Sequence, residues 1–137
     1  WMIAAKQFSF HIKIAVPEGF EPDAELLDAC KDRVSLTNSP AEAAKGADVV
    51  VTDTWVSMGQ EEEKQQRKQS FAGFTVDAGI MQQASSEAIF LHCLPAYRGY
   101  VVAEDVLVGP QSVVWVEAEN RLHAQKALIE FLLNEEN

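Results

Sequence analysis

The chain has few cysteines and prolines and no long apolar run, and each shortage excludes a class of protein. Its 137 residues include two cysteines, five prolines and seven glycines. The two cysteines, Cys30 and Cys93, lie in unrelated contexts, so we expect neither a disulfide framework nor a zinc site. No apolar run approaches the roughly 20 residues needed to cross a bilayer, and the N-terminus lacks a secretory signal pattern. We therefore expect a soluble, cytoplasmic protein.

Basic charge is also scarce. The sequence has 11 lysine and arginine residues against 21 aspartate and glutamate residues, which gives a formal net charge of -10. This charge repels nucleic acid phosphates and anionic lipid surfaces alike, so we expect neither nucleic acid nor a membrane as a partner. The length fits one domain over residues 1–137, which is long enough to bury a sizeable core.

Short apolar runs alternate along the chain with segments that carry helix signals. We expect buried strands at 11–16, 34–37, 48–52, 89–94 and 112–116. We expect helices at 23–31, 40–45 with Ser39 as the cap, 60–71, 78–84 and 118–133. This order predicts an α/β fold of three layers. A mostly parallel, Rossmann-like sheet of about five strands has helices on both faces.

The last helix has its own pattern. Apolar residues gather on one stripe of it, namely Leu122, Leu128, Ile129, Phe131 and Leu132. Such a stripe predicts a helix that packs on a core.

The strand exits hold the candidate functional residues, because ligands bind at the carboxyl ends of strands in such sheets. Cys93 ends the fourth predicted strand in the run His92-Cys93-Leu94-Pro95. It is either a reactive thiol or a small buried hydrophobe. Asp53 follows the third predicted strand and precedes a loop containing Ser57 and Met58. Its carboxylate either caps a turn or accepts hydrogen bonds from a substrate ammonium.

Arg121 stands near the start of the last predicted helix, in the run Glu117-Ala118-Glu119-Asn120-Arg121. Its guanidinium is either one more exposed charge or a bidentate clamp for an oxyanion or phosphate.

Three motifs in one order carry a family resemblance. Asp-Thr-Trp-Val-Ser-Met-Gly starts at Asp53, His-Cys-Leu-Pro at His92 and Glu-Ala-Glu-Asn-Arg at Glu117. Together they resemble the second, ornithine-binding domain of ornithine carbamoyltransferases, and the likeness spans nearly the whole chain. In that family the δ-amine of ornithine attacks carbamoyl phosphate to give citrulline and phosphate, with no metal or organic cofactor.

The resemblance implies a role for each candidate residue. Asp53 would hold the ornithine α-ammonium, and Ser57 and Met58 would lie on a loop that closes over the amino acid. Cys93 would help to orient or deprotonate the δ-amine, and His92 and Leu94 would contribute to substrate binding. Arg121 would stabilise charge on the carbonyl oxygen or the phosphate.

Parts of the family pattern are not matched. No segment resembles the phosphate-gripping motifs of the first domain, so carbamoyl phosphate is expected as a partner only together with that domain. The family also has a central strand before the segment that matches Trp1. We therefore expect a chain that is inactive alone, has unpaired sheet edges and forms a homo-oligomer. The alternative is a non-catalytic or engineered half-domain that folds or self-associates without binding ornithine.

Overall fold

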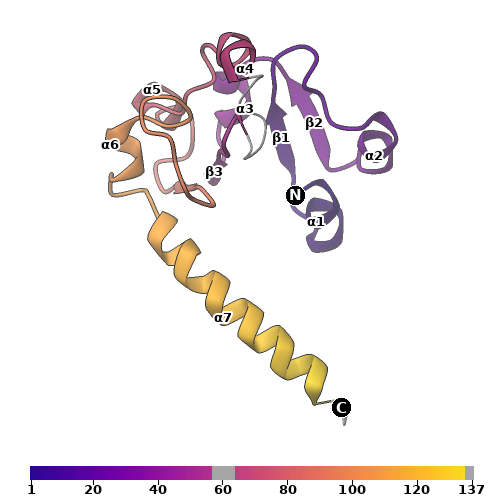
Figure 1. Ribbon diagram of the computed structural model, residues 1–137. Helices are drawn as coiled ribbons and strands as arrows, with labels where there is room; N and C mark the ends of the chain where they lie inside the picture. The colour runs from indigo at the N-terminus through magenta and orange to yellow at the C-terminus, as the bar shows by residue number, and fades with distance from the viewer. Residues whose placement is uncertain (57–63, 135–137) are drawn as a thin grey trace.

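The computed structural model describes residues 1–56 and 64–134. Helices and parallel strands alternate in it, which confirms the predicted α/β class (Figure 1). The helices are α1 (Met2–Phe8), α2 (Ala24–Ala29), α3 (Pro40–Ala44), α4 (Lys64–Ser70), α5 (Ala78–Met81), α6 (Glu104–Leu107) and α7 (Val114–Leu133). The strands are β1 (Ile12–Ala15), β2 (Val34–Thr37), β3 (Val49–Val51) and β4 (Ile89–Leu91).

The described strands form two small sheets and not one sheet of about five strands. β1 pairs with β2, and β3 pairs with β4, each pair in parallel. Within the described ranges no strand joins β1 to β3.

The predicted strand at 112–116 is wrong. Ser112 forms a single isolated bridge with Phe90, and the chain is helical from Val114 onward. Backbone bonds to Phe90 end at Val113, whose N–H donates to the Phe90 carbonyl at 3.0 Å. A short apolar run does not by itself distinguish a buried strand from a buried helix start, and here the buried Val114 begins a helix.

Side-chain caps define several of the short helices. The Asp23 carboxylate accepts a bond from the Leu26 N–H at the start of α2. Ser39 does the same for α3 through the Glu42 N–H, with Pro40 in the first turn, as the sequence predicted. Asp77 caps α5 through the Ile80 N–H.

The main core lies around β3 and β4. Phe90 in β4 is completely buried and packs with Val50 of β3 and with side chains from α5, α6 and the start of α7. A second, smaller core of Met2, Cys30 and Val34 holds α1 and α2 beside the β1–β2 sheet. The strands β3 and β4 therefore pack on one shared core, which fixes the positions of the residues that follow them.

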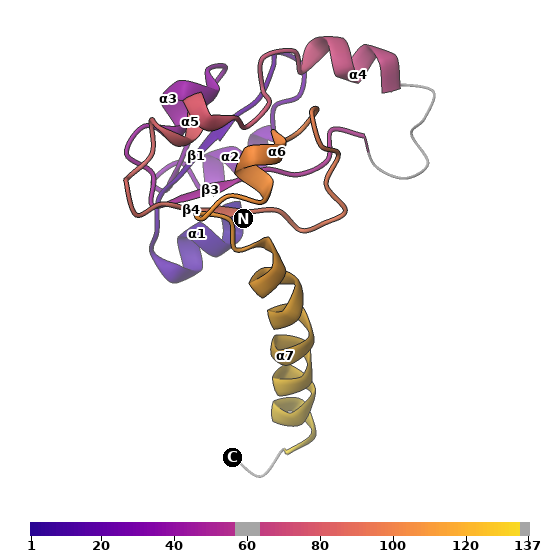
Figure 2. The ribbon, with the colours of Figure 1, turned by 90° about the vertical axis from the view of Figure 1, so that its left-hand side faces the viewer.

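The last helix projects away from the rest of the chain (Figures 1 and 2). Only Val114 of α7 is buried, and Leu122 and Phe131 are 67% and 72% exposed. The prediction that this helix packs on a core is therefore wrong for the described residues, because an apolar stripe shows a face that can be covered but supplies no partner. The helix also begins four residues before the predicted 118–133 range. No described helix is long and apolar enough to span a bilayer.

Candidate active site

Asp53 and Cys93 meet where the strands β3 and β4 end. The pairing of Val51 with Leu91 places each residue two positions beyond its strand. Parallel strands leave a sheet on the same edge, so the equal offsets bring the side chains together although 40 residues separate them. The Cys93 Sγ–H donates to Asp53 Oδ1 at 3.2 Å, and the same oxygen accepts from the Thr54 N–H at 2.6 Å.

This contact changes the chemistry of the thiol. Desolvation raises the pKa of Cys93 above its usual 9.0, and the hydrogen bond to Asp53 and the negative charges of Asp53 and Glu117 raise that pKa further. The thiol therefore stays protonated at neutral pH and acts as a hydrogen-bond donor to the carboxylate.

An open groove of about 580 Å³ runs past the thiol. Cys93, Leu94 and Pro95 line one part of it, and the first turns of α7 line another through Trp115, Ala118 and Arg121. Arg98 also lines this groove. The structure thus brings a thiol and two guanidinium groups to one surface, a combination suited to an anionic or carbonyl-containing substrate.

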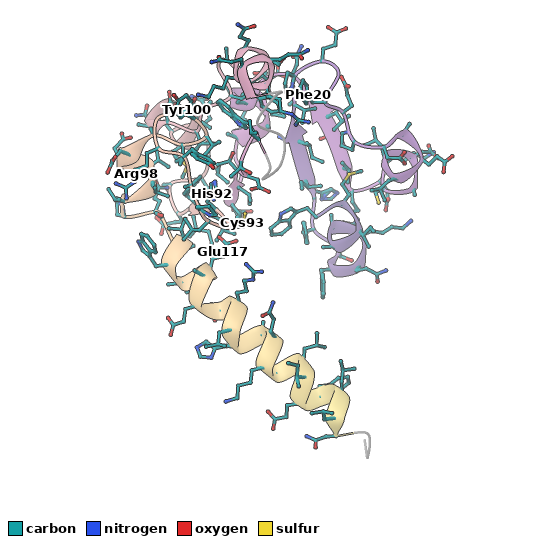
Figure 3. All side chains as sticks on the ribbon, viewed as in Figure 1. Phe20, His92, Cys93, Arg98, Tyr100 and Glu117 are labelled. Carbon is teal, nitrogen blue, oxygen red and sulfur yellow. The ribbon has the colours of Figure 1, made fainter. Side chains whose placement is uncertain are left out.

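His92 lies directly before the thiol and is completely buried. Its backbone N–H donates to Glu117 Oε2 at 2.9 Å, and its Nδ1 accepts from the Leu94 N–H, also at 2.9 Å. Burial lowers the pKa of His92 below 6.5, and the charges of Asp53 and Glu117 oppose that shift. In Figure 3 His92, Cys93 and Glu117 gather where α7 leaves the main body.

An aromatic cluster holds the segments on both sides of residues 57–63. Trp55 stacks on Phe71 with ring centroids 5.4 Å apart, and Phe20 meets the same ring edge-on at 4.9 Å. The guanidinium of Arg67 lies 5.4 Å from the Phe20 ring centroid and donates to the Trp55 carbonyl at 3.4 Å. The exits of β1 and β3 are thereby tied to α4.

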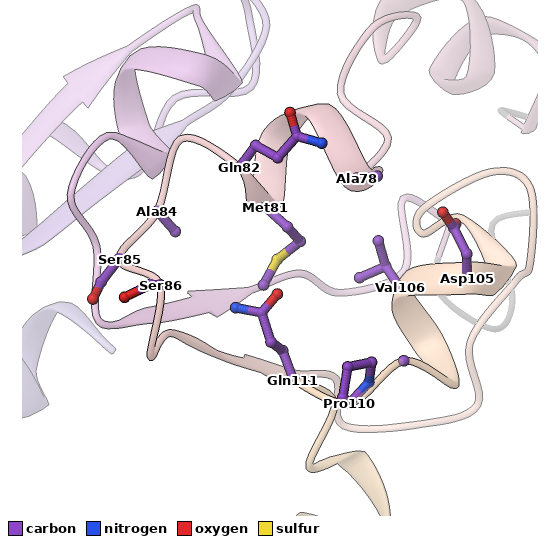
Figure 4. Close-up of a pocket in the computed structure, with 11 residues that line it drawn as sticks. Ala78, Met81, Gln82, Ala84, Ser85, Ser86, Asp105, Val106, Pro110 and Gln111 are labelled. Carbon is purple, nitrogen blue, oxygen red and sulfur yellow. The ribbon is translucent and has the colours of Figure 1, made fainter.

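Two further features of residues 1–56 and 64–134 bear on other ligands. No group of three or more histidine, cysteine, aspartate or glutamate side chains in these ranges is arranged to hold a metal ion. A second pocket of about 420 Å³ lies between α5 and α6, where Met81, Asp105 and Gln111 line it (Figure 4). It shares no lining residue with the groove beside Cys93.

The family follows from comparison with known proteins. Residues 1–132 match the family model described as aspartate/ornithine carbamoyltransferase, Asp/Orn-binding domain. The chain belongs to this family. It is 50% identical over 133 residues to the ornithine carbamoyltransferase of Chromohalobacter salexigens, covering 97% of this chain and 44% of that protein. It is 55% identical over 130 residues to the enzyme of Nitrosococcus oceani, covering 95% of this chain and 43% of that protein.

Solved structures show the same relation. The anabolic ornithine carbamoyltransferase of Campylobacter jejuni matches with a TM-score of 0.91 and 42% identity, over 98% of this chain and 47% of that one. The Burkholderia thailandensis enzyme matches with a TM-score of 0.86 and 47% identity, over 98% and 42% of the two chains. The chain therefore spans less than half the length of these relatives and corresponds to their Asp/Orn-binding domain.

The geometry separates the candidate residues into three groups. Asp53 contacts Cys93, and Leu94 and Arg121 line the groove beside that thiol. Ser57 and Met58 lie outside the described residues. His92 stays a prediction as a substrate-binding residue, although its complete burial favours an indirect role.

Sequence reasoning missed Glu117 and Arg98 as members of the site. Glu117 stands in a recognised motif, but only the fold shows its contact with a residue 25 positions away. Arg98 follows the loop that contains Cys93 by a few residues, and that nearness was the available signal.

Proposed function

We propose that this chain is the ornithine-binding and catalytic part of an ornithine carbamoyltransferase, which converts ornithine and carbamoyl phosphate to citrulline and phosphate. The observation that carries the proposal is the contact of Cys93 with Asp53 at the mouth of a groove that also holds Arg121. The names of the relatives supply the reaction class.

Asp53 binds the ornithine α-ammonium. Its carboxylate is exposed at a strand exit, and both of its bonds among the described residues use Oδ1. The other oxygen is thus available to an ammonium donor, which makes a charge-assisted hydrogen bond. Ser57 and Met58 complete the amino-acid site in this proposal.

Cys93 handles the δ-amine. An amine of this type has a pKa near the value of about 10.4 for lysine, so it must lose a proton before it attacks. The amine nitrogen then forms a bond to the carbamoyl carbon, the bond from that carbon to the phosphate oxygen breaks, and the nitrogen releases a further proton. The thiol orients the amine. Because the thiol is bonded to Asp53, the Asp53 carboxylate lies nearby as an acceptor for the proton that the nitrogen releases after the attack.

Arg121 acts on the charge that builds up on the other side of the reacting carbon. In the tetrahedral intermediate the carbonyl oxygen becomes an oxyanion, and phosphate leaves as an anion. A guanidinium in the same groove as the thiol stabilises either charge through paired N–H donors.

Carbamoyl phosphate needs a further domain in this proposal. The relatives are more than twice as long as the matched region, and the match covers only their Asp/Orn-binding domain. We therefore expect the 137-residue chain to bind ornithine and to form no citrulline at an enzymatic rate. The split sheet and the exposed side chains of α7 favour a homo-oligomer.

Calorimetric titration with ornithine tests the binding step. The chain is expected to show saturable heat, and Asp53→Asn is expected to weaken the affinity at least tenfold because it removes the charge that pairs with the ammonium. Asp48→Asn is the matched control, since Asp48 is exposed at the opposite end of the same strand. Equal affinity in both variants would contradict the role of Asp53.

A citrulline assay tests the catalytic part. The chain alone, given ornithine and carbamoyl phosphate, should release no citrulline above background. Citrulline formation that Cys93→Ala abolishes would show that the carbamoyl-phosphate domain is dispensable.

A non-catalytic half-domain that self-associates is the second candidate. The exposure of Leu128 and Phe131 on α7 favours it, because an uncovered apolar face promotes association. Concentration-dependent mass in sedimentation, together with no ornithine heat, would support this alternative over the enzymatic one.

A further inference from the structure

We propose that His92 and Glu117 form a positioning pair that fixes the Cys93 loop to the first turn of α7. The pair holds the thiol of Cys93 and the guanidinium of Arg121 at one groove. Neither His92 nor Glu117 touches substrate in this account. Its consequence for citrulline synthesis rests on the function proposed above, but the geometric claim stands by itself.

The pair holds the chain on both sides of the thiol. Before Cys93, the backbone N–H of His92 donates to Glu117 Oε2 at 2.9 Å, and after it, the backbone N–H of Leu94 donates to the ring Nδ1 of His92 at 2.9 Å. Leu94 has a φ of 50°, a left-handed conformation that a leucine rarely adopts. The bond from its N–H to His92 Nδ1 restrains the backbone at this residue.

Burial of the His92 ring lowers the stability of the fold unless its Nδ1 is needed to accept the Leu94 N–H. Its side chain is fully buried, and its Nε2 has no hydrogen-bond partner among the described residues. Since Nδ1 accepts a bond, the neutral ring carries its proton on Nε2, so a donor is left buried and unsatisfied. An apolar side chain in this place avoids that cost, which indicates that the acceptor at Nδ1 is what the position requires.

Glu117 carries the restraint to the arginine. Glu117 and Arg121 are four residues apart in α7, so they lie on one face, one turn apart. The helix meets the main body only near its start, where Val114 is buried and Glu117 receives the His92 N–H. Beyond that turn its side chains are exposed, so the placement of Arg121 depends on this first contact.

Charge gives the pair a second effect on the thiol. The charged groups around Cys93 are Asp53 from the β3 exit, Glu117 and Arg121 from α7, and Arg98 from the following loop. Asp53 and Glu117 both raise the pKa of Cys93. A variant that only removes the Glu117 charge and a variant that only releases the loop therefore alter the thiol by different routes.

The test measures the rate at which iodoacetamide alkylates Cys93 as a function of pH, by mass spectrometry and without ornithine. The full chain is used with Cys30→Ala, so that Cys93 is its only thiol. Asp53→Asn is the positive control, because removal of its negative charge should shift the pH profile of Cys93 alkylation. Failure of ornithine binding leaves this measurement unaffected, so the two proposals can fail separately.

The variants are chosen to separate position from charge. His92→Asn keeps an acceptor near Nδ1 and should preserve the wild-type pH profile, whereas His92→Leu removes it and should lower the Cys93 pKa toward 9.0. We expect alkylation at pH 8 to become faster in His92→Leu, because a lower pKa increases the fraction of Cys93 that is thiolate. Glu117→Gln keeps the hydrogen-bond acceptor and loses only the charge, whereas Glu117→Ala loses both. The Cys93 pKa should therefore fall further in Glu117→Ala than in Glu117→Gln. Glu119→Gln, on the exposed face of α7, is the control.

A role in stability alone gives a different result. It would lower the melting temperature of His92→Leu and Glu117→Ala and leave the Cys93 pH profile at its wild-type position. That outcome, with a shifted profile in Asp53→Asn, would overturn the proposal. If His92→Leu does not fold, Glu117→Ala against Glu117→Gln gives the same readout at a half-buried position, and equal profiles in those two variants would also overturn it.

Discussion

The stability of the chain should fall on mild acidification because of one buried histidine. Burial lowers the pKa of His92 in the folded chain below the value of 6.5 expected when it is unfolded. Above about pH 7.5 the ring is neutral in both states and stability does not depend on it. As the pH falls below 6.5, the unfolded state binds the proton first, so the free energy of unfolding decreases until the folded pKa is reached.

The size of this loss has an upper limit. At pH 5.5 an unfolded histidine that titrates at 6.5 gains about 1.4 kcal/mol from protonation, and the folded state gains less. Protonation in the folded state would also place a second N–H against the Leu94 N–H, where Nδ1 now accepts. We therefore expect a loss of at most about 1.4 kcal/mol between pH 7.5 and pH 5.5.

Urea unfolding at a series of pH values, followed by tryptophan fluorescence, measures this slope. His92→Asn should flatten it over this range, because asparagine keeps an acceptor and has no titration. His123→Gln is the matched control, since His123 is exposed on α7 and faces Glu119 at 3.6 Å. If His92→Asn kept the wild-type slope and His123→Gln removed it, our assignment of the slope to the buried ring would be refuted.

Three further predictions concern packing. Phe90→Ala should lower the free energy of unfolding by about 3 to 5 kcal/mol in urea, because the ring is fully buried, while Phe8→Ala, at 79% exposure, should change it by less than about 0.5 kcal/mol. Phe71→Ala should weaken ornithine binding in calorimetry while Cys93 alkylation stays unchanged, because its ring stacks on Trp55, which precedes the proposed substrate-binding residues Ser57 and Met58. Leu128→Lys with Phe131→Lys should lower the sedimentation mass, and an unchanged mass would exclude α7 from the self-association surface.

The sequence was sufficient for elements whose signal is local. The strand at 34–37 was predicted with the bounds that β2 has, and Ser39 caps α3 as its position before Pro40 indicated. The sequence also placed Asp53 and Cys93 at strand exits, but their contact depends on the direct pairing of β3 with β4, which the fold shows.

Features set by distant contacts were beyond such reasoning. The apolar run around Val114 has the composition of a strand, and its start as a helix depends on backbone bonds that end at Val113. The apolar stripe on α7 indicated a packed face. Whether that face is covered depends on a partner, which the sequence of the helix alone does not identify. The bond from His92 to Glu117 joins positions 25 residues apart and has no local signal at all.

Asp53, Cys93 and Arg121 extend from elements that differ in how firmly they are packed. This difference bears on how the site works. Asp53 and Cys93 extend from strands that share the core around Phe90, so their separation is set by the most buried part of the chain. Among the described residues, Arg121 extends from a helix whose only buried residue, Val114, lies at its start, and a small rotation there would move the guanidinium within the groove. Ornithine binding should therefore depend mainly on the strand exits. Charge stabilisation in the transition state should depend on whatever fixes α7, which makes the His92 and Glu117 contact the point where substrate binding and catalysis can be separated by mutation.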